Sequence, residues 1–233
     1  MIHKNIGIGE IFITDASFGH VGVGQKGFAE HLNQVTGAAP DHIVWMDQIH
    51  SPTVEFVDQV NGAGMILQKT DGVMTNQSGA LLITKTADCV PILLWNEREK
   101  TIAALHCGWR GFLAGIIGSF AKLCQQRGLR PEQFTAFLGP HLRVDNFEVQ
   151  QDFLDALAAP HRHLLIQREG KSFFDITRGV FELLESTGIH SIEDCGIDTF
   201  SSPEYFSYRR WFQVPEGERP KNYNTFASCI ILT

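Results

Sequence analysis

Six short apolar segments follow one another between residues 43 and 105, and they constrain the fold more than any other feature of the chain. They run Ile43–Met46, Val54–Val57, Gly72–Thr75, Leu81–Thr84, Val90–Trp95 and Thr101–Leu105. Each is shorter than a typical helix and carries residues that favour strands, so each predicts a strand. Turn-forming residues separate them at Ser51–Pro52, Asn61–Gly64, Asn76–Gly79 and Asn96–Lys100. The last of these turns predicts a β-hairpin.

Amphipathic periodicity appears on both sides of this strand-rich region. It predicts helices over Lys26–Thr36, Phe112–Leu123, Val149–Leu157 and Ile176–Ser186, and two further strands over Phe134–Leu138 and Phe226–Leu232. Strand and helix do not alternate strictly, which argues against a TIM barrel or a Rossmann sheet. We therefore expect a mixed α/β (α+β) layered fold, with residues 1–233 forming a single domain.

The charge balance and the cysteines exclude several classes of protein. The chain has 19 Lys and Arg against 26 Asp and Glu, a net charge of −7, and no basic block. We therefore expect no nucleic-acid partner and no anionic membrane surface as a partner. No apolar run has the length of a signal peptide or a membrane span. The five cysteines show no disulfide spacing, so a cytoplasmic location is expected.

Three short segments place metal-binding residue types at predicted strand ends. They are Gln48–His50, Thr86–Pro91 and His106–Gly111. His50, Cys89 and His106 would offer zinc three donors and leave a fourth position for water or substrate, which is typical of a catalytic site. Spacing alone does not decide this, because ten histidines offer many such triples. The alternative interpretation is structural: His50 is then a loop residue, His106 a core histidine and Cys89 a small buried side chain.

The neighbouring cysteine competes with His106 for the metal. If Leu105 and Cys107 point to one side of the strand end, His106 points to the other. We therefore expect Cys107 to be structural.

Six further residues complete the predicted site: Gln48, Arg110, Arg209 and Arg210 for substrate and phosphate, and Asp88 and Glu148 for acid–base catalysis beside Cys89. Arg110 is predicted near a helix N-terminus, where backbone N–H groups favour an anion. The paired arginines lie among aromatic residues and could clamp a phosphate. Each of these residues also has a structural interpretation, as a surface arginine, a turn aspartate or the first acidic residue of a helix.

Several motifs taken together resemble one known family. QIH, TADCVPILL, ALHCGWRG, LGPHL, FEV and PEYFSYRR occur in this order between Ser17 and Arg210. They resemble the multicopper polyphenol oxidoreductase, or laccase-domain, family, which is also described as purine nucleoside phosphorylase-like and peptidoglycan editing factor-like. The resemblance implies a four-layer sandwich of mixed sheets flanked by helices, with His50, Cys89 and His106 as metal ligands. It also implies phosphorolysis of adenosine, inosine and methylthioadenosine, with adenosine deamination beside it.

The resulting functional prediction is a zinc-dependent purine nucleoside phosphorylase with nucleoside and phosphate as small-molecule partners. Three alternatives stay open. A copper-dependent polyphenol oxidase would hold Cu²⁺ in the same residues. A metal-free cysteine hydrolase would use Cys89 as nucleophile and His106 as base. A non-enzymatic role in cell-wall control would act through a protein partner. The chain departs from the family pattern at Cys107, where alanine is usual, and over Trp211–Pro215.

Overall fold

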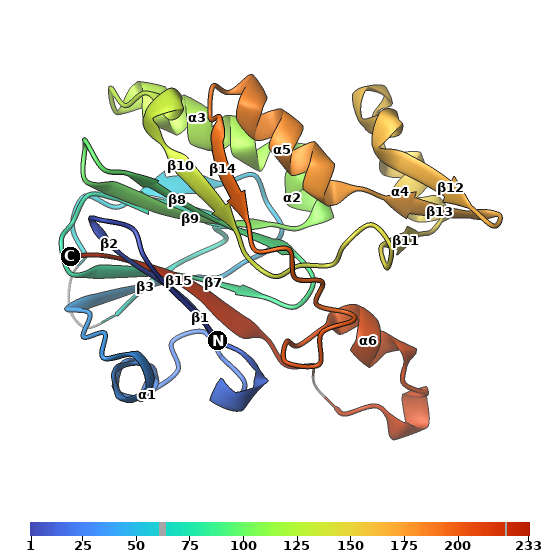
Figure 1. The fold of residues 1–233 in the computed structure, drawn as a ribbon, viewed down its shortest axis with the longest axis horizontal. Helices are drawn as coiled ribbons and strands as arrows, with labels where there is room; N and C mark the ends of the chain where they lie inside the picture. Colours follow the sequence, from blue (N-terminus) through green and yellow to red (C-terminus); the bar gives the residue numbers. More distant parts are fainter. Residues whose placement is uncertain (61–63, 222) are drawn as a thin grey trace.

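Two six-stranded sheets lie face to face between layers of helices (Figure 1). The computed structural model describes residues 1–60, 64–221 and 223–233. The first sheet has the order β1 (Ile2–Asn5), β2 (Gly9–Ile13), β15 (Phe226–Leu232), β7 (Ala80–Thr86), β3 (His42–Met46) and β5 (Met65–Leu67). The second has the order β14 (Ser191–Asp194), β10 (Thr135–Leu138), β8 (Val90–Asn96), β9 (Thr101–Cys107), β6 (Gly72–Thr75) and β4 (Val54–Phe56).

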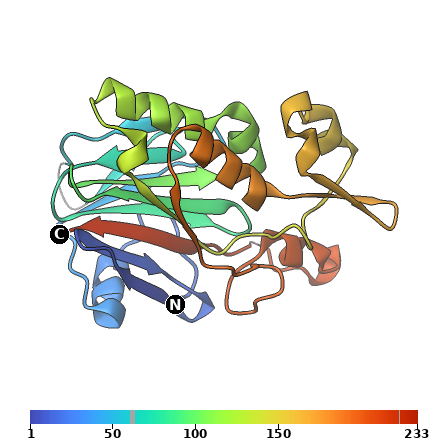
Figure 2. The ribbon, with the colours of Figure 1, turned by 45° about the horizontal axis from the view of Figure 1, so that its top comes forward.

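Some of the helices cover the outer faces of the two sheets, and others lie beside the sheets. The helices are α1 (Phe28–Thr36), α2 (Trp109–Ala114), α3 (Ile116–Gln126), α4 (Gln151–Ala156), α5 (Ile176–Ser186) and α6 (Tyr208–Gln213). Figure 2 shows α1 on one side of the stacked sheets and α3 and α5 on the other. A small third sheet, of β11 (Glu148–Val149), β13 (Lys171–Phe174) and β12 (Leu165–Arg168), lies beside α4 and α5.

Three hydrophobic cores hold these layers together. One fills the space between α1 and the first sheet, one lies between the sheets, and one joins the second sheet to α3 and α5. Side chains of β15 alternate between two of them: Phe226 and Ile230 face the second sheet, whereas Cys229 and Ile231 face α1. Because both sheets are covered on both faces, strands such as β15 are buried along their whole length. The predicted four-layer mixed fold is confirmed.

The predicted strands between residues 43 and 105 are all present; Gly72–Thr75 has the predicted bounds and the others have shifted ends. The hairpin is confirmed, because β8 and β9 pair antiparallel across the Asn96–Lys100 turn. Strand β9 continues to Cys107, so His106 is a strand residue. The turn predicted at Asn61–Gly64 falls largely outside the described residues.

Two helix predictions need correction. The helix predicted over Phe112–Leu123 is two helices, α2 and α3, separated by Gly115 at φ 89°, a left-handed conformation that glycine adopts at little cost. Val149 lies in β11 opposite Ser172, so the helix predicted from this residue begins only at Gln151. Within the described residues, no helix is long and apolar enough to cross a membrane.

Candidate metal centre

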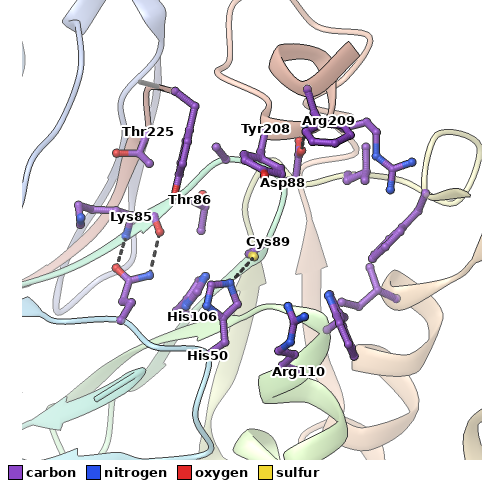
Figure 3. A pocket seen from close by; sticks show the side chains of 18 of the residues that line it. His50, Lys85, Thr86, Asp88, Cys89, His106, Arg110, Tyr208, Arg209 and Thr225 are labelled. Atoms are coloured by element: carbon purple, nitrogen blue, oxygen red, sulfur yellow. Dashed lines mark hydrogen bonds between the residues drawn. The ribbon is translucent and has the colours of Figure 1, made fainter. Parts of the chain in front are cut away.

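His50, Cys89 and His106 converge at one end of the stacked sheets (Figure 3). His50 follows β3, Cys89 directly precedes β8, and His106 lies near the end of β9. The donor atoms of the three side chains lie within 4.8 Å of one another, and Cys89 Sγ is 3.7 Å from His50 Nε2. Two imidazoles and a thiol at this separation form a donor set that zinc or copper can occupy, with a coordination position left open.

A buried carboxylate fixes both histidines. Asp71, at 0% exposure, accepts hydrogen bonds from the backbone N–H groups of Ile49 (3.2 Å), His50 (2.9 Å) and Ser51 (2.7 Å). These bonds stabilise the left-handed backbone of His50, whose φ is 62°. The same carboxylate is 2.8 Å from His106 Nδ1. It therefore orients the imidazole so that Nε2 is available to a metal, as carboxylates behind metal-binding histidines do.

Charges within the site favour a thiolate beside an imidazolium. Burial alone would raise the pKa of Cys89, but the neighbouring His106 and His50 hold it at about 6. Burial opposes protonation of His106, yet Cys89 and Asp71 raise its pKa to about 9. The thiolate is the form that binds metal, whereas a ligating histidine must be neutral. Binding of a metal would therefore release a proton from His106.

Close packing around His106 explains why residue 108 is a glycine and why Cys107 takes no part in the site. A Cβ at Gly108 would lie 2.6 Å from His50 Cδ2 and 2.9 Å from Cys89 Sγ, so a side chain there would displace the site. Cys107 is fully buried in the core that faces the helices, together with Leu105. Burial also raises the pKa of this thiol far above its usual value. Cys107 thus lies on the opposite face of β9 from His106, in agreement with the predicted alternation.

A cavity of about 840 Å³ opens over the three donor residues. Exposed aromatic side chains of Tyr208, Phe212 and Tyr223 line one part of it. Trp109 and Phe147 line another part. A cavity of this size, in which aromatic walls meet several charged and polar side chains, has the character of a small-molecule site.

Three of the residues predicted to bind substrate line this cavity. Gln48 is held by a pair of hydrogen bonds with the backbone of Lys85, at 2.8 and 2.9 Å. Arg110 lies in the first turn of α2 and packs 4.1 Å from the Trp109 ring. Arg209 donates to the carbonyl of Glu148 at 2.8 Å. Figure 3 shows Arg110 and Arg209 on the same side of Cys89, away from Lys85.

Arg210 lies outside the residues that line this cavity. Its guanidinium donates to the backbone carbonyls of Thr199, Phe200 and Tyr205 and so holds the loop before α6. The structure therefore separates the two arginines that the sequence pairs.

The two carboxylates predicted for acid–base catalysis differ in their surroundings. Asp88 accepts hydrogen bonds from Thr199 Oγ1 and from the backbone N–H of Arg209, both at 2.6 Å, so it anchors the start of α6. Burial raises the pKa of Asp88, and these bonds oppose the rise. Glu148 lines the cavity and lies 3.0 Å from Lys171 Nζ, and this hydrogen bond lowers the pKa of Glu148.

Sequence reasoning missed three residues of the site: Asp71, Lys85 and Thr86. Lys85 lines the cavity, and burial lowers its pKa while Asp47 opposes that effect. Thr86 begins the Thr86–Pro91 segment and Lys85 directly precedes it, so proximity to that motif was the available signal. Asp71 had a weaker signal, as a charged residue beside a buried strand.

The fold and the His–Cys–His site define a class of four-layer proteins with three converging donors that could hold a metal ion. The chain belongs to the multi-copper polyphenol oxidoreductase laccase family, whose sequence model matches residues 26–227. It is 31% identical over 195 residues to a purine nucleoside phosphorylase of Corynebacterium glutamicum, covering 82% of this chain and 79% of that protein. It is 30% identical over 178 residues to the purine nucleoside phosphorylase YfiH of Shigella flexneri, covering 75% and 71%.

Solved structures show the same fold. A Neisseria meningitidis protein superposes with a TM-score of 0.75 at 23% identity, covering 99% of this chain and 98% of that one. A hypothetical protein YfiH of Bacillus licheniformis superposes with a TM-score of 0.74 at 23% identity, covering 87% and 78%.

Proposed function

We propose that this protein is a zinc-dependent purine nucleoside phosphorylase that acts on adenosine, inosine and methylthioadenosine. The observation that carries the proposal is an open three-donor site in a cavity that also presents two arginines and a group of exposed aromatic rings. The relatives named as purine nucleoside phosphorylases support it. The aromatic rings of Tyr208 and Tyr223 suit a flat purine base. The guanidinium groups of Arg110 and Arg209 suit a phosphate.

In this reaction a phosphate oxygen bonds to the anomeric carbon of the ribose while the bond from that carbon to the purine breaks. Arg110 and Arg209 bind and orient the phosphate and offset its charge. Asp88 acts as a positioning residue, because its carboxylate anchors the helix that carries Tyr208 and Arg209. Zinc held by His50, Cys89 and His106 would supply a Lewis acid that polarises a bound oxygen. Glu148 lines the same cavity, and because its lowered pKa keeps it ionised, it would accept a proton and not donate one to the leaving purine.

Adenosine deamination is the second activity that we assign to this site. It needs water instead of phosphate, and zinc deaminases activate such a water. Residues 1–233 would act as one domain. A cytoplasmic location is also part of the proposal, because the five cysteines are unpaired. The partners that we propose are small molecules, a purine nucleoside and phosphate.

The test is release of purine base from adenosine and inosine with and without inorganic phosphate. We expect zinc-loaded protein to form free base and ribose 1-phosphate only when phosphate is present. Chelation should abolish the reaction and zinc should restore it. Zinc-bound protein that releases no base from either nucleoside would exclude the proposal.

A metal-free cysteine hydrolase is the second candidate, favoured by one observation. Cys89, His106 and Asp71 are arranged as a nucleophile, a base and an orienting carboxylate. Such an enzyme would survive chelation and be inactivated by a thiol alkylator. A copper oxidase, favoured by the family's name, would oxidise phenols only with added copper and without regard to phosphate.

A further inference from the structure

Thr86 lines the cavity, and its hydroxyl is a buried polar group. Thr86 is 2% exposed, and its Oγ1 has no hydrogen-bond partner among residues 1–60, 64–221 and 223–233. Thr84 and Ser228 carry similar unpartnered hydroxyls, but neither of them lines the cavity. Thr86 therefore differs from them in its access to a ligand.

Strand geometry places Thr86 opposite the metal-binding residues. Along β7, Ala80 and Leu82 pack between the two sheets, so alternation directs Thr84 and Thr86 to the same face. Along β9, Ile102 and Ala104 pack between the sheets, which directs His106 to that face of the second sheet. Thr86 and His106 thus enter one interlayer space from opposite sides. Figure 3 shows Thr86 and Cys89 among the side chains that line the cavity.

An unpartnered buried hydroxyl is unfavourable, because it loses its bonds to water and gains none in return. A ligand oxygen in the cavity would remove that cost. Stabilisation that arises only when the ligand binds contributes to affinity and to catalysis, not to folding.

We propose that Thr86 is a substrate-contact residue whose hydroxyl hydrogen-bonds an oxygen of the ligand held beside His50, Cys89 and His106. The proposal rests on the proposed function, in which that oxygen belongs to the phosphate or to a ribose hydroxyl. Both are oxygen groups that a hydroxyl can bond, and the kinetic constants for the two substrates distinguish them.

The test compares Thr86→Val with Thr84→Val, a matched change on the same face of the same strand. Both variants remove an unpartnered hydroxyl and keep the side-chain shape, so neither should lower the Tm of the ligand-free protein or its zinc content. We expect kcat/KM to fall roughly 10- to 100-fold in Thr86→Val and to stay near the wild-type value in Thr84→Val. Thr86→Ser should recover most of the loss. A raised KM for phosphate identifies the phosphate oxygen, and a raised KM for nucleoside identifies the ribose.

Equal activity in Thr86→Val and wild type would overturn the inference. So would a lower Tm of ligand-free Thr86→Val that Thr84→Val does not share, because the hydroxyl would then have a structural role. The proposed function fails separately, when the wild type itself releases no base. In that event the readout is the rise in Tm that inorganic phosphate or adenosine gives zinc-loaded protein. The rise in Tm with at least one of these two probes should be smaller in Thr86→Val than in Thr84→Val. An equal rise in Tm in both variants, or no rise in either, overturns the inference.

Discussion

Replacing Asp71 with asparagine keeps the shape of the side chain and removes its charge. One carboxylate oxygen accepts from the His50 N–H and His106 Nδ1, and the other accepts from the N–H groups of Ile49 and Ser51 and from Ser51 Oγ. An amide can accept at one of these positions only, so its NH₂ group would face two or three donors. Breaking a buried, hydrogen-bonded ionic group in this way costs about 3–5 kcal/mol.

The assay is thermal unfolding of metal-free protein near neutral pH. For a chain of this length, the cost corresponds to a fall in Tm of about 6–20 °C. Asp58→Asn is the matched control: its carboxylate pairs with Arg127 at the surface, so its loss should cost no more than about 1 kcal/mol. Zinc affinity should also fall about 10- to 100-fold in Asp71→Asn, because His50 and His106 lose their orienting group.

The pH dependence provides an independent check. Burial would raise the pKa of Asp71, but hydrogen bonds from His106 and Ser51 lower it to about 2, against 3.8 in the unfolded chain. A carboxyl group with a lowered folded-state pKa stabilises the fold above its unfolded value, and this stability is lost as pH falls from about 4 to about 2. The difference amounts to about 2 kcal/mol. Asp71→Asn should lack this part of the acid dependence. An unchanged Tm and acid profile would refute the reasoning.

Five further substitutions separate neighbouring roles. Cys89→Ala should abolish tight zinc binding, whereas Cys107→Ala should retain zinc and lose about 1–2 kcal/mol of the free energy of unfolding. Equal metal loss in both variants, measured by metal analysis, would contradict the placement of Cys107 and His106 on opposite faces of β9. Arg110→Ala should raise the KM for phosphate roughly 10- to 100-fold without changing zinc content. Arg210→Ala should instead lower the free energy of unfolding by about 2–3 kcal/mol. Enzyme kinetics and the Tm distinguish the two variants. Asp88→Asn should raise the KM for nucleoside about tenfold, with zinc content unchanged, because α6 loses its anchor; an unchanged KM would argue against that role.

The alternation and helical periodicity of the sequence predicted the features that depend on neighbouring residues in the chain. Alternation along β9 was enough to separate Cys107 from His106, and the apolar face of α5 was enough to set the bounds of that helix. The break at Gly115 was not visible, because the apolar period continues through the left-handed residue. Short strands such as β1 and β14 were missed because they are only partly buried and carry little apolar pattern.

The polar part of the site was harder to predict because its contacts are distant in sequence. Asp71 reaches His106 across 35 positions, and Asp88 reaches Arg209 across 121. Neither pairing has a local pattern. The Arg209–Arg210 pair was interpreted as one group, yet the first turn of α6 directs one guanidinium toward the cavity and the other to backbone carbonyls.

We propose above that zinc held by His50, Cys89 and His106 supports phosphorolysis of purine nucleosides. The most direct measurement titrates zinc into metal-free protein and follows phosphate-dependent release of base from inosine at each zinc-to-protein ratio. We expect activity to rise with bound zinc and to reach a plateau at about one equivalent, because the site has three donors for one ion. Cys89→Ala should show no activity. Full activity in the metal-free protein, or no phosphate-dependent release at saturating zinc, would contradict it.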